Sequence, residues 1–295
     1  YSSWVSYETN LETERDFGVD TTDPTGGTVY DGTETKVDKD FNDGSLSSLS
    51  ANWDGFNADV SGLGYYEYSI GTTVGGTDIK GWTNVGVGTS ATATSLTLQT
   101  SSPYYFNVRA IDNAGNTQTP VISSDGQLIA PSLTFSINPG SVSFDNLNAG
   151  NSYTDTETAT LTTSTNAYNG YVIRASVNDY LRSVGGDFFI DDFDGGTYAS
   201  PDEWLTGDRG FGYNSSDTTI QGTNKFNDTP CPGGGNPLCY APFSQTGPGD
   251  IIADHTDTVS GSPISNEEFT ITFKVKTDPI QEASTYSTVV TYTIT

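Results

Sequence analysis

The only histidine of this sequence and the aspartates beside it are the first candidates for chemistry. His255, in the segment IIADHTD, is followed and preceded by Asp257 and Asp254, and a histidine oriented by a carboxylate can act as a general base. However, the sequence contains no G-x-S-x-G segment for a nucleophilic serine, no Gly-Lys step and no G-x-G-x-x-G segment for phosphates. Acids are so numerous that no pair stands out as a glycosidase pair. We therefore expect a protein that is not an enzyme, with glycoside hydrolysis as the remaining enzymatic alternative.

A second group of candidate ligands lies in the segment GGDFFIDDFDGG. Asp187, Asp191, Asp192 and Asp194 place hard carboxylate oxygens around a Gly-rich turn, and Ca²⁺ prefers such ligands. The spacing differs from that of an EF-hand loop, and the closing glutamate is absent. The alternative is an acidic loop exposed to solvent, which we favour. Calcium at these residues is the only cofactor that the sequence suggests.

The two cysteines lie close together in the segment CPGGGNPLC. Seven residues rich in Gly and Pro separate Cys231 from Cys239, so the chain can bend back and place the two sulfurs within bonding distance. Two cysteines and one histidine provide too few ligands for a tetrahedral zinc site. We therefore predict a Cys231–Cys239 disulfide and an oxidising, extracellular location.

Two segments match the acceptor pattern for N-glycosylation, Asn214-Ser-Ser and Asn227-Asp-Thr. Both lie in a stretch from about residue 180 to 255 that lacks clear periodicity and is dense in Gly, Asp and aromatic residues. A stretch of this kind inside a compact domain is usually functional or packed against a partner. Its aromatic residues are candidates for a glycan platform, an interface or a small core, and we favour the last two: Tyr198, Trp204, Phe211, Tyr213 and Phe226.

The composition favours an all-β protein with an acidic surface. Aromatic residues make up 12% of the 295 residues, enough to build cores although only 33% of the residues are hydrophobic. Thr, Val, Tyr and Phe dominate the patterned segments and fit a pleated sheet. The formal net charge of −26 disfavours binding to nucleic acid or to anionic lipid. No apolar run is long enough to span a bilayer, so membrane insertion is not expected.

Residues 1–23 are predicted to form an extension. In YSSWVSYET, Trp4 lies on one face of an extended strand, whereas Val5 and Tyr7 lie on the other. An acidic, linker-like segment follows. A short strand outside a domain either frays or adds to an exposed sheet edge of its own chain or of a neighbour. Because the sequence starts at Tyr1 without a basic and apolar leader, we expect a mature product or an excised fragment.

Residues 24–130 are predicted to form a first β-sandwich, because short alternating strands are separated by turn signals. The strand that follows Leu98 and a short corner places Tyr105, Asn107 and Arg109 on the outer face, and Leu98 and Tyr104 resemble a tyrosine corner. The residues that we expect to face the core are Leu49, Ala51, Trp53, Tyr66, Tyr68, Ile70, Tyr104, Phe106, Val108 and Ala110. Pro131 restricts the residue before it and marks the boundary.

Residues 131–295 are predicted to form a second β-sandwich. Its strands include LTFSIN, a Thr-rich run and NGYVIRASV, and the stretch from about residue 180 to 255 is a long loop insertion. Two alternating runs close the sequence, EEFTITFKVKT and ASTYSTVVTYTIT. We expect these two runs to pair with each other as a terminal antiparallel pair.

Both domains resemble modules of bacterial surface proteins. The segments SLSANWDGF, GLGYYEYSIGTTVGGTDIKGWTNVG and SLTLQTSSPYYFNVRAIDNAGNTQTPVISSDG are similar to the fibronectin type III-like repeats of bacterial secreted and surface proteins. This resemblance implies a spacer, or a module that contacts proteins or glycans, without catalytic residues. NGY after a Thr-rich run and the closing TYSTVVTYTIT resemble a Thr-rich β-sandwich module of surface layers and filaments. That resemblance implies no enzymatic activity.

We therefore expect an extracellular structural protein with two tandem β-sandwiches of the immunoglobulin or fibronectin III type. It would assemble with copies of itself into a pilus-like filament or a surface layer, with Trp4, Val5 and Tyr7 in a donor strand that adds to the next subunit. The alternative is a monomeric adhesin whose insertion binds a cell-surface glycan or protein. The N-terminal segment favours the first hypothesis, because a monomeric adhesin has no need of a donor strand.

Overall fold

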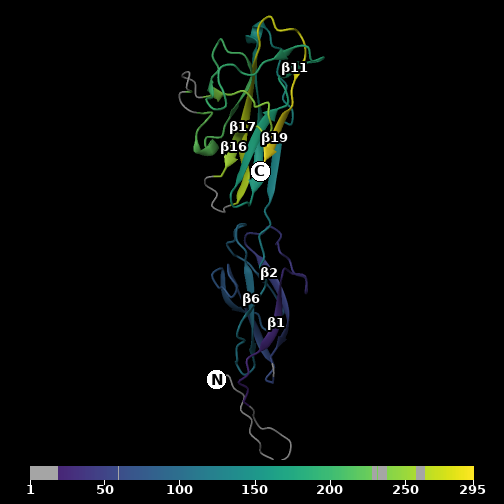
Figure 1. Ribbon diagram of the computed structural model, residues 1–295, viewed down its shortest axis with the longest axis vertical. Coiled ribbons are helices and arrows are strands. Elements are labelled where there is room, and N and C mark those ends of the chain that lie inside the picture. Colours follow the sequence, from purple (N-terminus) through teal and green to yellow (C-terminus); the bar gives the residue numbers. More distant parts are fainter. Residues whose placement is uncertain (1–18, 59, 228–230, 232–237, 257–262) are drawn as a thin grey trace, which may run out of the picture. The chain divides into compact units, whose positions relative to one another are not determined.

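The computed structural model describes residues 19–58, 60–227, 231, 238–256 and 263–295 (Figure 1). The chain divides into two compact units, unit 1 with residues 1–131 and unit 2 with residues 132–295. The boundary therefore falls one residue after the expected position. The predicted donor residues Trp4, Val5 and Tyr7 lie outside the described residues.

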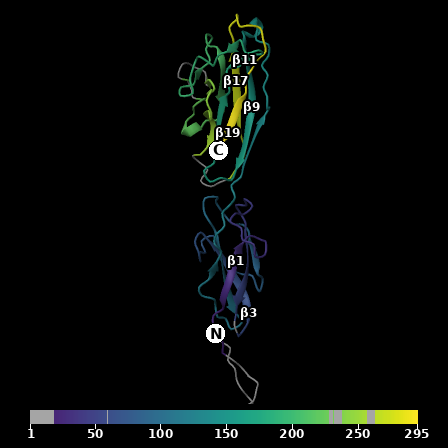
Figure 2. The same cartoon turned by 45° about the vertical axis from the view of Figure 1, so that its right-hand side comes forward.

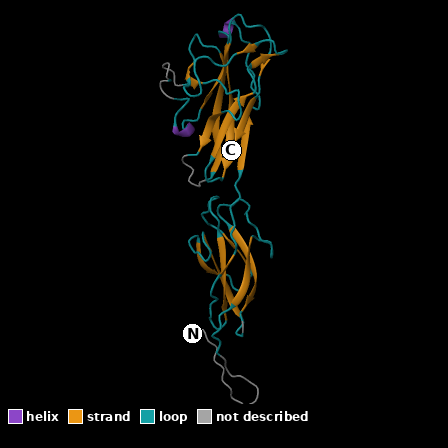
Figure 3. Cartoon of the chain, in the orientation of Figure 1, coloured by secondary structure: helices purple, strands orange, loops and turns teal. Residues whose placement is uncertain are grey.

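The regular structure in the described residues is β-structure, apart from two short 3₁₀ turns at Ala149–Asn151 and Ile220–Gly222 (Figure 3). The predicted all-β class is thus confirmed. No helix in the described part of the chain is long and apolar enough to cross a membrane.

Unit 1 is a sandwich of two antiparallel sheets. One sheet has the strand order β1-β2-β5 and the other has the order β4-β3-β6-β7. The strands are β1 (Thr25–Asp31), β2 (Leu49–Asn57), β3 (Leu63–Gly71), β4 (Lys80–Asn84), β5 (Ser90–Ala93), β6 (Tyr105–Asp112) and β7 (Ile122–Ser123).

The core of unit 1 contains the residues that the alternation predicted. Trp53 of β2 is 2% exposed and contacts Tyr66 of β3 edge to face, with 5.9 Å between the ring centroids. Tyr68 of β3 stacks on Phe106 of β6 with a centroid distance of 5.1 Å. The Trp53–Tyr66 contact joins the two sheets, whereas Tyr68 and Phe106 pack side by side on one sheet, and these large rings bury much apolar surface per residue.

Asn107 of β6 departs from the predicted alternation, because it is fully buried although its position was expected on the outer face. Its Oδ1 accepts hydrogen bonds from the Gly75 amide at 2.7 Å and from the Ser123 hydroxyl at 2.6 Å. Its Nδ2 donates to the Gly76 carbonyl at 2.7 Å. These bonds satisfy the buried amide group and tie the β3–β4 turn and β7 to β6.

Unit 1 begins earlier than the predicted start at residue 24. Asp20 is 4% exposed, and its carboxylate accepts hydrogen bonds from the backbone amides of Thr22 at 3.0 Å and Ser61 at 3.1 Å. The side-chain amide of Asn116 donates to the Asp20 carbonyl at 3.2 Å. The C-terminal end of the predicted extension is therefore part of the first sandwich.

The described residues of unit 2 form four sheets, and the sheets that contain β17 and β10 enclose a shared core. The strand orders are β14-β17-β9-β8, β16-β10-β19, β12-β11-β18 and β13-β15. Figure 2 shows β9 beside β17. The strands are β8 (Leu133–Asn138), β9 (Thr154–Thr165), β10 (Tyr171–Val177), β11 (Leu181–Ser183), β12 (Phe189–Ile190), β13 (Asp202–Glu203), β14 (Gly210–Ser215), β15 (Cys239–Tyr240), β16 (Asp250–His255), β17 (Ile264–Lys276), β18 (Tyr286–Ser287) and β19 (Val290–Ile294).

The predicted pairing of the two closing runs is wrong. β17 pairs with β9 and β14, whereas β19 pairs with β10 in the opposite sheet. The alternation of each run predicted which face is buried, but it did not specify the neighbouring strand. The predicted insertion is also more regular than expected, because its strands β14 and β16 complete the two main sheets.

Tyr104 forms the predicted tyrosine corner, and its hydroxyl provides a test of the fold of unit 1. The phenol oxygen accepts a hydrogen bond from the Gln99 amide at 2.7 Å and lies 3.4 Å from the Gln99 carbonyl, while the ring is 3% exposed. We expect Tyr104→Phe to lower the free energy of unfolding of unit 1 by about 1–2 kcal/mol, because the partly buried Gln99 amide loses its hydrogen-bond partner. Urea denaturation measures this change.

The neighbouring Tyr105→Phe substitution is the matched control for Tyr104→Phe, because Tyr105 is only half-buried. We expect this control to change the free energy of unfolding by less than about 0.5 kcal/mol. Equal effects of the two substitutions would contradict a special role for the corner.

Candidate functional site

On one side of unit 2, both main sheets end in a strand whose outer edge pairs with no other strand in the described part of the chain. β8 is the last strand of one sheet and β19 is the last strand of the other. Phe135 of β8 and Tyr292 of β19 contact each other, with 6.3 Å between their ring centroids, so the two edges are neighbours. We call this side, formed by β8 and by β18 with β19, the open side of unit 2. On the opposite side, Ala241 exchanges two backbone hydrogen bonds of 2.9 Å with Tyr213 of β14.

The apolar side chains of the open side are less buried than the rest of the core. Leu161 of β9, Ile173 of β10 and Ile271 of β17 are fully buried. By contrast, Leu133 of β8 is 42% exposed. The other apolar residues of these edges pack against the core but are only partly buried: Phe135, Ile137, Tyr286, Val290, Tyr292 and Ile294. The open side therefore leaves apolar surface that a further strand would cover.

The backbone register shows which groups of β19 face outward. Val172 and Thr295 exchange two hydrogen bonds, of 2.8 and 3.0 Å, at the end of the β10–β19 ladder. Hydrogen-bonded and non-hydrogen-bonded pairs alternate along an antiparallel ladder, so the amides of Ile294, Tyr292 and Val290 point away from β10. An added strand can bond to this backbone and cover the side chains of the same residues.

A groove of about 680 Å³ extends from the open side into unit 2. Val142 and Phe144 line it from the β8–β9 connection, and Phe273 and Val275 of β17 line it from the core. The ring of Phe144 contacts Phe211 edge to face at 6.2 Å. The wall on the other side consists of residues 277–279, residues 281–288 and Val290. The groove thus lies where an incoming apolar side chain would meet both sheets.

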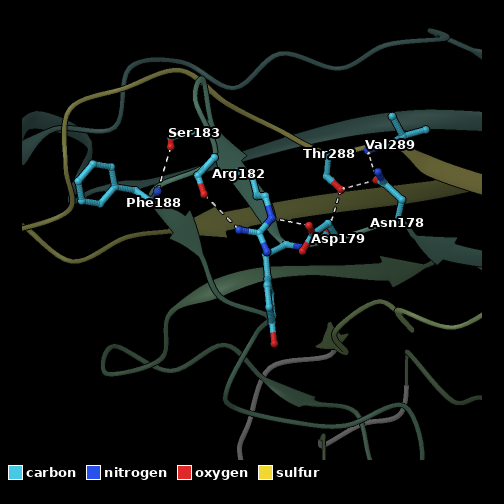
Figure 4. Close-up of polar contacts among 9 residues, drawn as sticks. Asn178, Asp179, Arg182, Ser183, Phe188, Thr288 and Val289 are labelled. Carbon is cyan, nitrogen blue, oxygen red and sulfur yellow. Dashed lines mark hydrogen bonds and ion pairs between the residues drawn. The ribbon is translucent and has the colours of Figure 1, made fainter.

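A polar network holds β18 and β19 in place beside β10 and β11 (Figure 4). Asn178 Oδ1 accepts a hydrogen bond from the Val289 amide at 3.0 Å. The Thr288 hydroxyl lies 3.1 Å from Asn178 Oδ1 and 2.7 Å from the carbonyl of Asp179, whose carboxylate forms an ion pair with Arg182. These side-chain contacts hold the start of β19 in position. The outer edge of β19 is therefore ordered before any partner binds.

His255 is held in a side-chain network rather than beside a nucleophile. Its Nδ1 lies 2.8 Å from both carboxylate oxygens of Glu267 on β17, and the Tyr171 hydroxyl donates a hydrogen bond to the same carboxylate. Asp254 lies on the opposite face of β16 and is buried, so it does not orient the imidazole. Asp257 lies outside the described residues. This network joins β10, β16 and β17.

Three of the four calcium candidates line a second cavity, of about 330 Å³, whose charged residues are Asp191, Asp192, Asp194, Arg209, Lys276 and Asp278. The two cationic side chains oppose metal binding there. Asp192 accepts a hydrogen bond from Gln245, and Asp194 accepts one from the Arg209 amide, both at 2.8 Å. Asp187 is exposed. Among the described residues, the four carboxylates do not form a group with three oxygens within 4.8 Å, so calcium binding at this loop stays a prediction without geometric support.

Among the aromatic residues of the insertion, Phe211, Tyr213 and Phe226 belong to the main core of unit 2, whereas Trp204 packs with Phe193 and Tyr240 in a small core of the insertion. Tyr213 and Phe226 are 0% exposed, and Phe211 is 6% exposed. Trp204 stacks on Phe193 with 4.2 Å between the ring centroids. A glycan platform needs exposed rings, so that alternative is wrong for the three buried residues.

The predicted disulfide between Cys231 and Cys239 is confirmed. Both cysteines are buried, at 1% and 0% exposure. Cys239 belongs to β15, which pairs with β13, and its amide donates a hydrogen bond to the Phe226 carbonyl at 2.9 Å. The disulfide therefore anchors residue 231 to the small core of the insertion.

The two glycosylation candidates use their side-chain amides inside unit 2. Asn214 is 3% exposed, and its Nδ2 donates to the carbonyls of Phe226 at 2.9 Å and Cys239 at 3.0 Å. A glycan would replace one of the two Nδ2 hydrogens and break at least one of these bonds, and the buried nitrogen has no access to solvent, so the structure contradicts Asn214 as an acceptor in the folded protein. Asn227 is partly buried, and its Nδ2 donates to the Ser215 carbonyl at 2.8 Å.

The sequence analysis missed a cluster of three aspartates in unit 1. One carboxylate oxygen from each of Asp31, Asp38 and Asp125 lies within 4.8 Å of the other two. A signal was available in the sequence, because Asp31 follows Val29 at the inward-facing period of two on β1. An aspartate at such a position is unusual, since buried charges are normally paired or bound to a metal.

Comparison with known proteins identifies no family for this chain. No family model matches it, and no curated protein matches it. Among solved structures, the crystal structure of the CupB6 tip adhesin from Pseudomonas aeruginosa is similar to it at 9% sequence identity, over 92% of this chain and 93% of that chain. The TM-score of this comparison is 0.23, which carries no argument about fold or function.

Reduction of the Cys231–Cys239 disulfide tests its role in unit 2. Closing so short a loop stabilises the folded state by about 2–3 kcal/mol in the chain-entropy model. We expect reduction to increase hydrogen exchange in β13 and β15, while β9 and β17 stay protected. Unit 1 contains no cysteine and is the internal control. Unchanged exchange in β15, or loss of protection throughout unit 2, would contradict this expectation.

Proposed function

We propose that this protein is an extracellular structural subunit that assembles with copies of itself into a filament or a surface layer. Residues 1–9 of one copy would add as a strand to the open side of unit 2 in the next copy. The observation that carries the proposal is the pair of neighbouring free edges, β8 and β19, with partly buried apolar side chains between them. The confirmed disulfide supports the extracellular location.

The chemistry of the proposed donor fits the open side. YSSWVSYET alternates, so a strand formed by it directs Trp4 to one face and Val5 and Tyr7 to the other. One face can enter the groove of about 680 Å³, while the backbone bonds to the free amides of β19. Each large apolar side chain that is buried contributes about 2 kcal/mol, and each backbone hydrogen bond contributes about 1 kcal/mol.

The proposed donor has enough chain to reach a neighbouring copy. Asp20 is anchored in unit 1, so the linker consists of residues 10–19. Ten extended residues span about 33 Å. We further infer that unit 1 serves as a spacer, which is what its resemblance to fibronectin type III-like repeats implies. The adhesin alternative is less well supported, because three of the five aromatic candidates for a glycan platform are buried.

Deletion of residues 1–9 tests the proposal. We expect the truncated chain to keep both units folded and to stay monomeric at concentrations at which the full chain forms oligomers, as measured by light scattering and electron microscopy. A synthetic peptide with the sequence YSSWVSYET should bind the truncated chain, and the same peptide with Trp4→Ala should bind more weakly. Assembly of the truncated chain to normal length, or a full chain that stays monomeric at high concentration, would contradict the proposal.

A cross-linking experiment locates the acceptor. The chain has no free cysteine among its described residues, and its two cysteines are bonded to each other, so added cysteines are the reactive thiols. We expect Val5→Cys chains to form a disulfide with Leu133→Cys chains, identified by mass spectrometry of the linked peptides. Val74→Cys is the matched control, because Val74 is 69% exposed and lies in unit 1. Equal linkage to both positions would exclude the open side as the specific acceptor.

A further inference from the structure

Three segments of unit 1 bring the Asp31, Asp38 and Asp125 carboxylates together. Asp31 ends β1, Asp38 lies in the β1–β2 connection, and Asp125 lies in the turn after β7. The Asp31 amide donates a hydrogen bond to Asp38 Oδ1 at 2.8 Å. The Leu128 amide donates to the Asp40 carbonyl at 2.8 Å. These contacts tie the β1–β2 connection to the end of β1 and to the segment that follows Asp125.

Asp31 is a buried carboxylate with an unsatisfied oxygen. Its residue is 1% exposed, and its Oδ2 has no hydrogen-bond partner among the described residues. The Ser124 side chain and the Gly126 amide donate hydrogen bonds to this carboxylate, and the charges of Asp38 and Asp125 lie nearby. An uncompensated charge in this position costs free energy unless a counter-charge binds.

No cationic side chain in the described part of the chain compensates this cluster. None of the ion pairs among the described residues involves Asp31, Asp38 or Asp125. Lys39 is the nearest cationic residue in the sequence, and its ammonium forms no such pair. Asp40 adds a further negative charge near Asp125. The cluster therefore combines a buried unpartnered oxygen with a local excess of negative charge.

We propose that Asp31, Asp38 and Asp125 bind one Ca²⁺ ion. Ca²⁺ takes oxygen ligands at about 2.3–2.6 Å, so two ligands on opposite sides of the ion are about 5 Å apart. Three oxygens within 4.8 Å of one another can therefore contact the same ion. Mg²⁺ spans only about 4 Å between opposite ligands and requires octahedral geometry. Asp38 and Asp125 are exposed, so water can complete the coordination from the solvent side.

The bound ion joins segments that are distant in the sequence. It connects the end of β1 to the β1–β2 connection and to the turn after β7, and it neutralises the buried carboxylate of Asp31. Calcium therefore stabilises unit 1 by binding its folded state. This inference concerns unit 1 alone and does not depend on assembly through unit 2.

Thermal unfolding of the full chain with and without calcium tests the site. We expect CaCl₂ to raise the melting temperature of unit 1 by about 10 °C when the ion is at a hundred times its dissociation constant. Isothermal titration should give one ion per chain, with a dissociation constant of about 10⁻⁴–10⁻³ M, as in extracellular modules. NaCl at equal ionic strength controls for screening, and MgCl₂ should give a smaller shift. A wild-type chain that responds equally to CaCl₂ and NaCl would overturn the proposal.

Substitutions assign the effect to the three carboxylates. Asp38→Asn with Asp125→Asn changes two exposed residues, and we expect it to abolish the calcium-dependent shift while the protein stays folded. Asp31→Asn should also abolish the shift, and without calcium it should melt no lower than the wild type, because a buried charge is removed.

The matched control for these substitutions removes the same charge from unit 2. Asp191→Asn with Asp194→Asn should keep the full calcium response. Loss of the response in this control, or its persistence in the Asp38 and Asp125 variant, would place the calcium site elsewhere and overturn the proposal.

Discussion

The antiparallel ladder between β9 and β17 is the interaction on which unit 2 depends. These are its longest strands, and the other strands of their sheet attach to them, β14 to β17 and β8 to β9. Their inward residues, such as Leu161 and Ile271, are fully buried. The ladder pairs residue 154 with residue 276. It can therefore form only when the chain between these two residues has folded back on itself. Residues that look like an insertion in the sequence therefore supply strands to both sheets.

A sandwich of two open sheets has edge strands on both of its sides. In unit 2 the two sides differ in how these edges are covered. On one side of unit 2 the insertion covers the edge, with Ala241 bonded to Tyr213 of β14. On the open side, the outer edges of β8 and β19 pair with no strand among the described residues, and their apolar side chains are partly buried. Free edges of this kind promote pairing with another chain unless charge or proline blocks them. Their presence beside a groove is the physical basis of the proposed assembly.

Negative charge is the second constraint on this protein. Most acids of a chain with a net charge of −26 can remain in solvent, where screening reduces their repulsion. In the loop with Asp191, Asp192 and Asp194, the positive charges of Arg209 and Lys276 line the same cavity and offset part of the negative charge. The cluster around Asp31, Asp38 and Asp125 forms no ion pair with a cationic side chain among the described residues, and this difference is why the proposed calcium site lies in unit 1.

The period-two alternation of the sequence determined the all-β class and most core residues, since the buried face of a strand depends only on local spacing. It predicted Trp53 and Phe106 in the core. The disulfide followed from a different local feature, the short Gly- and Pro-rich spacing between Cys231 and Cys239. The tertiary structure alone decided which strand lies beside β19, that Asn214 is buried, and that Asp31 meets Asp125. These outcomes depend on contacts between residues far apart in the chain, which local spacing does not encode.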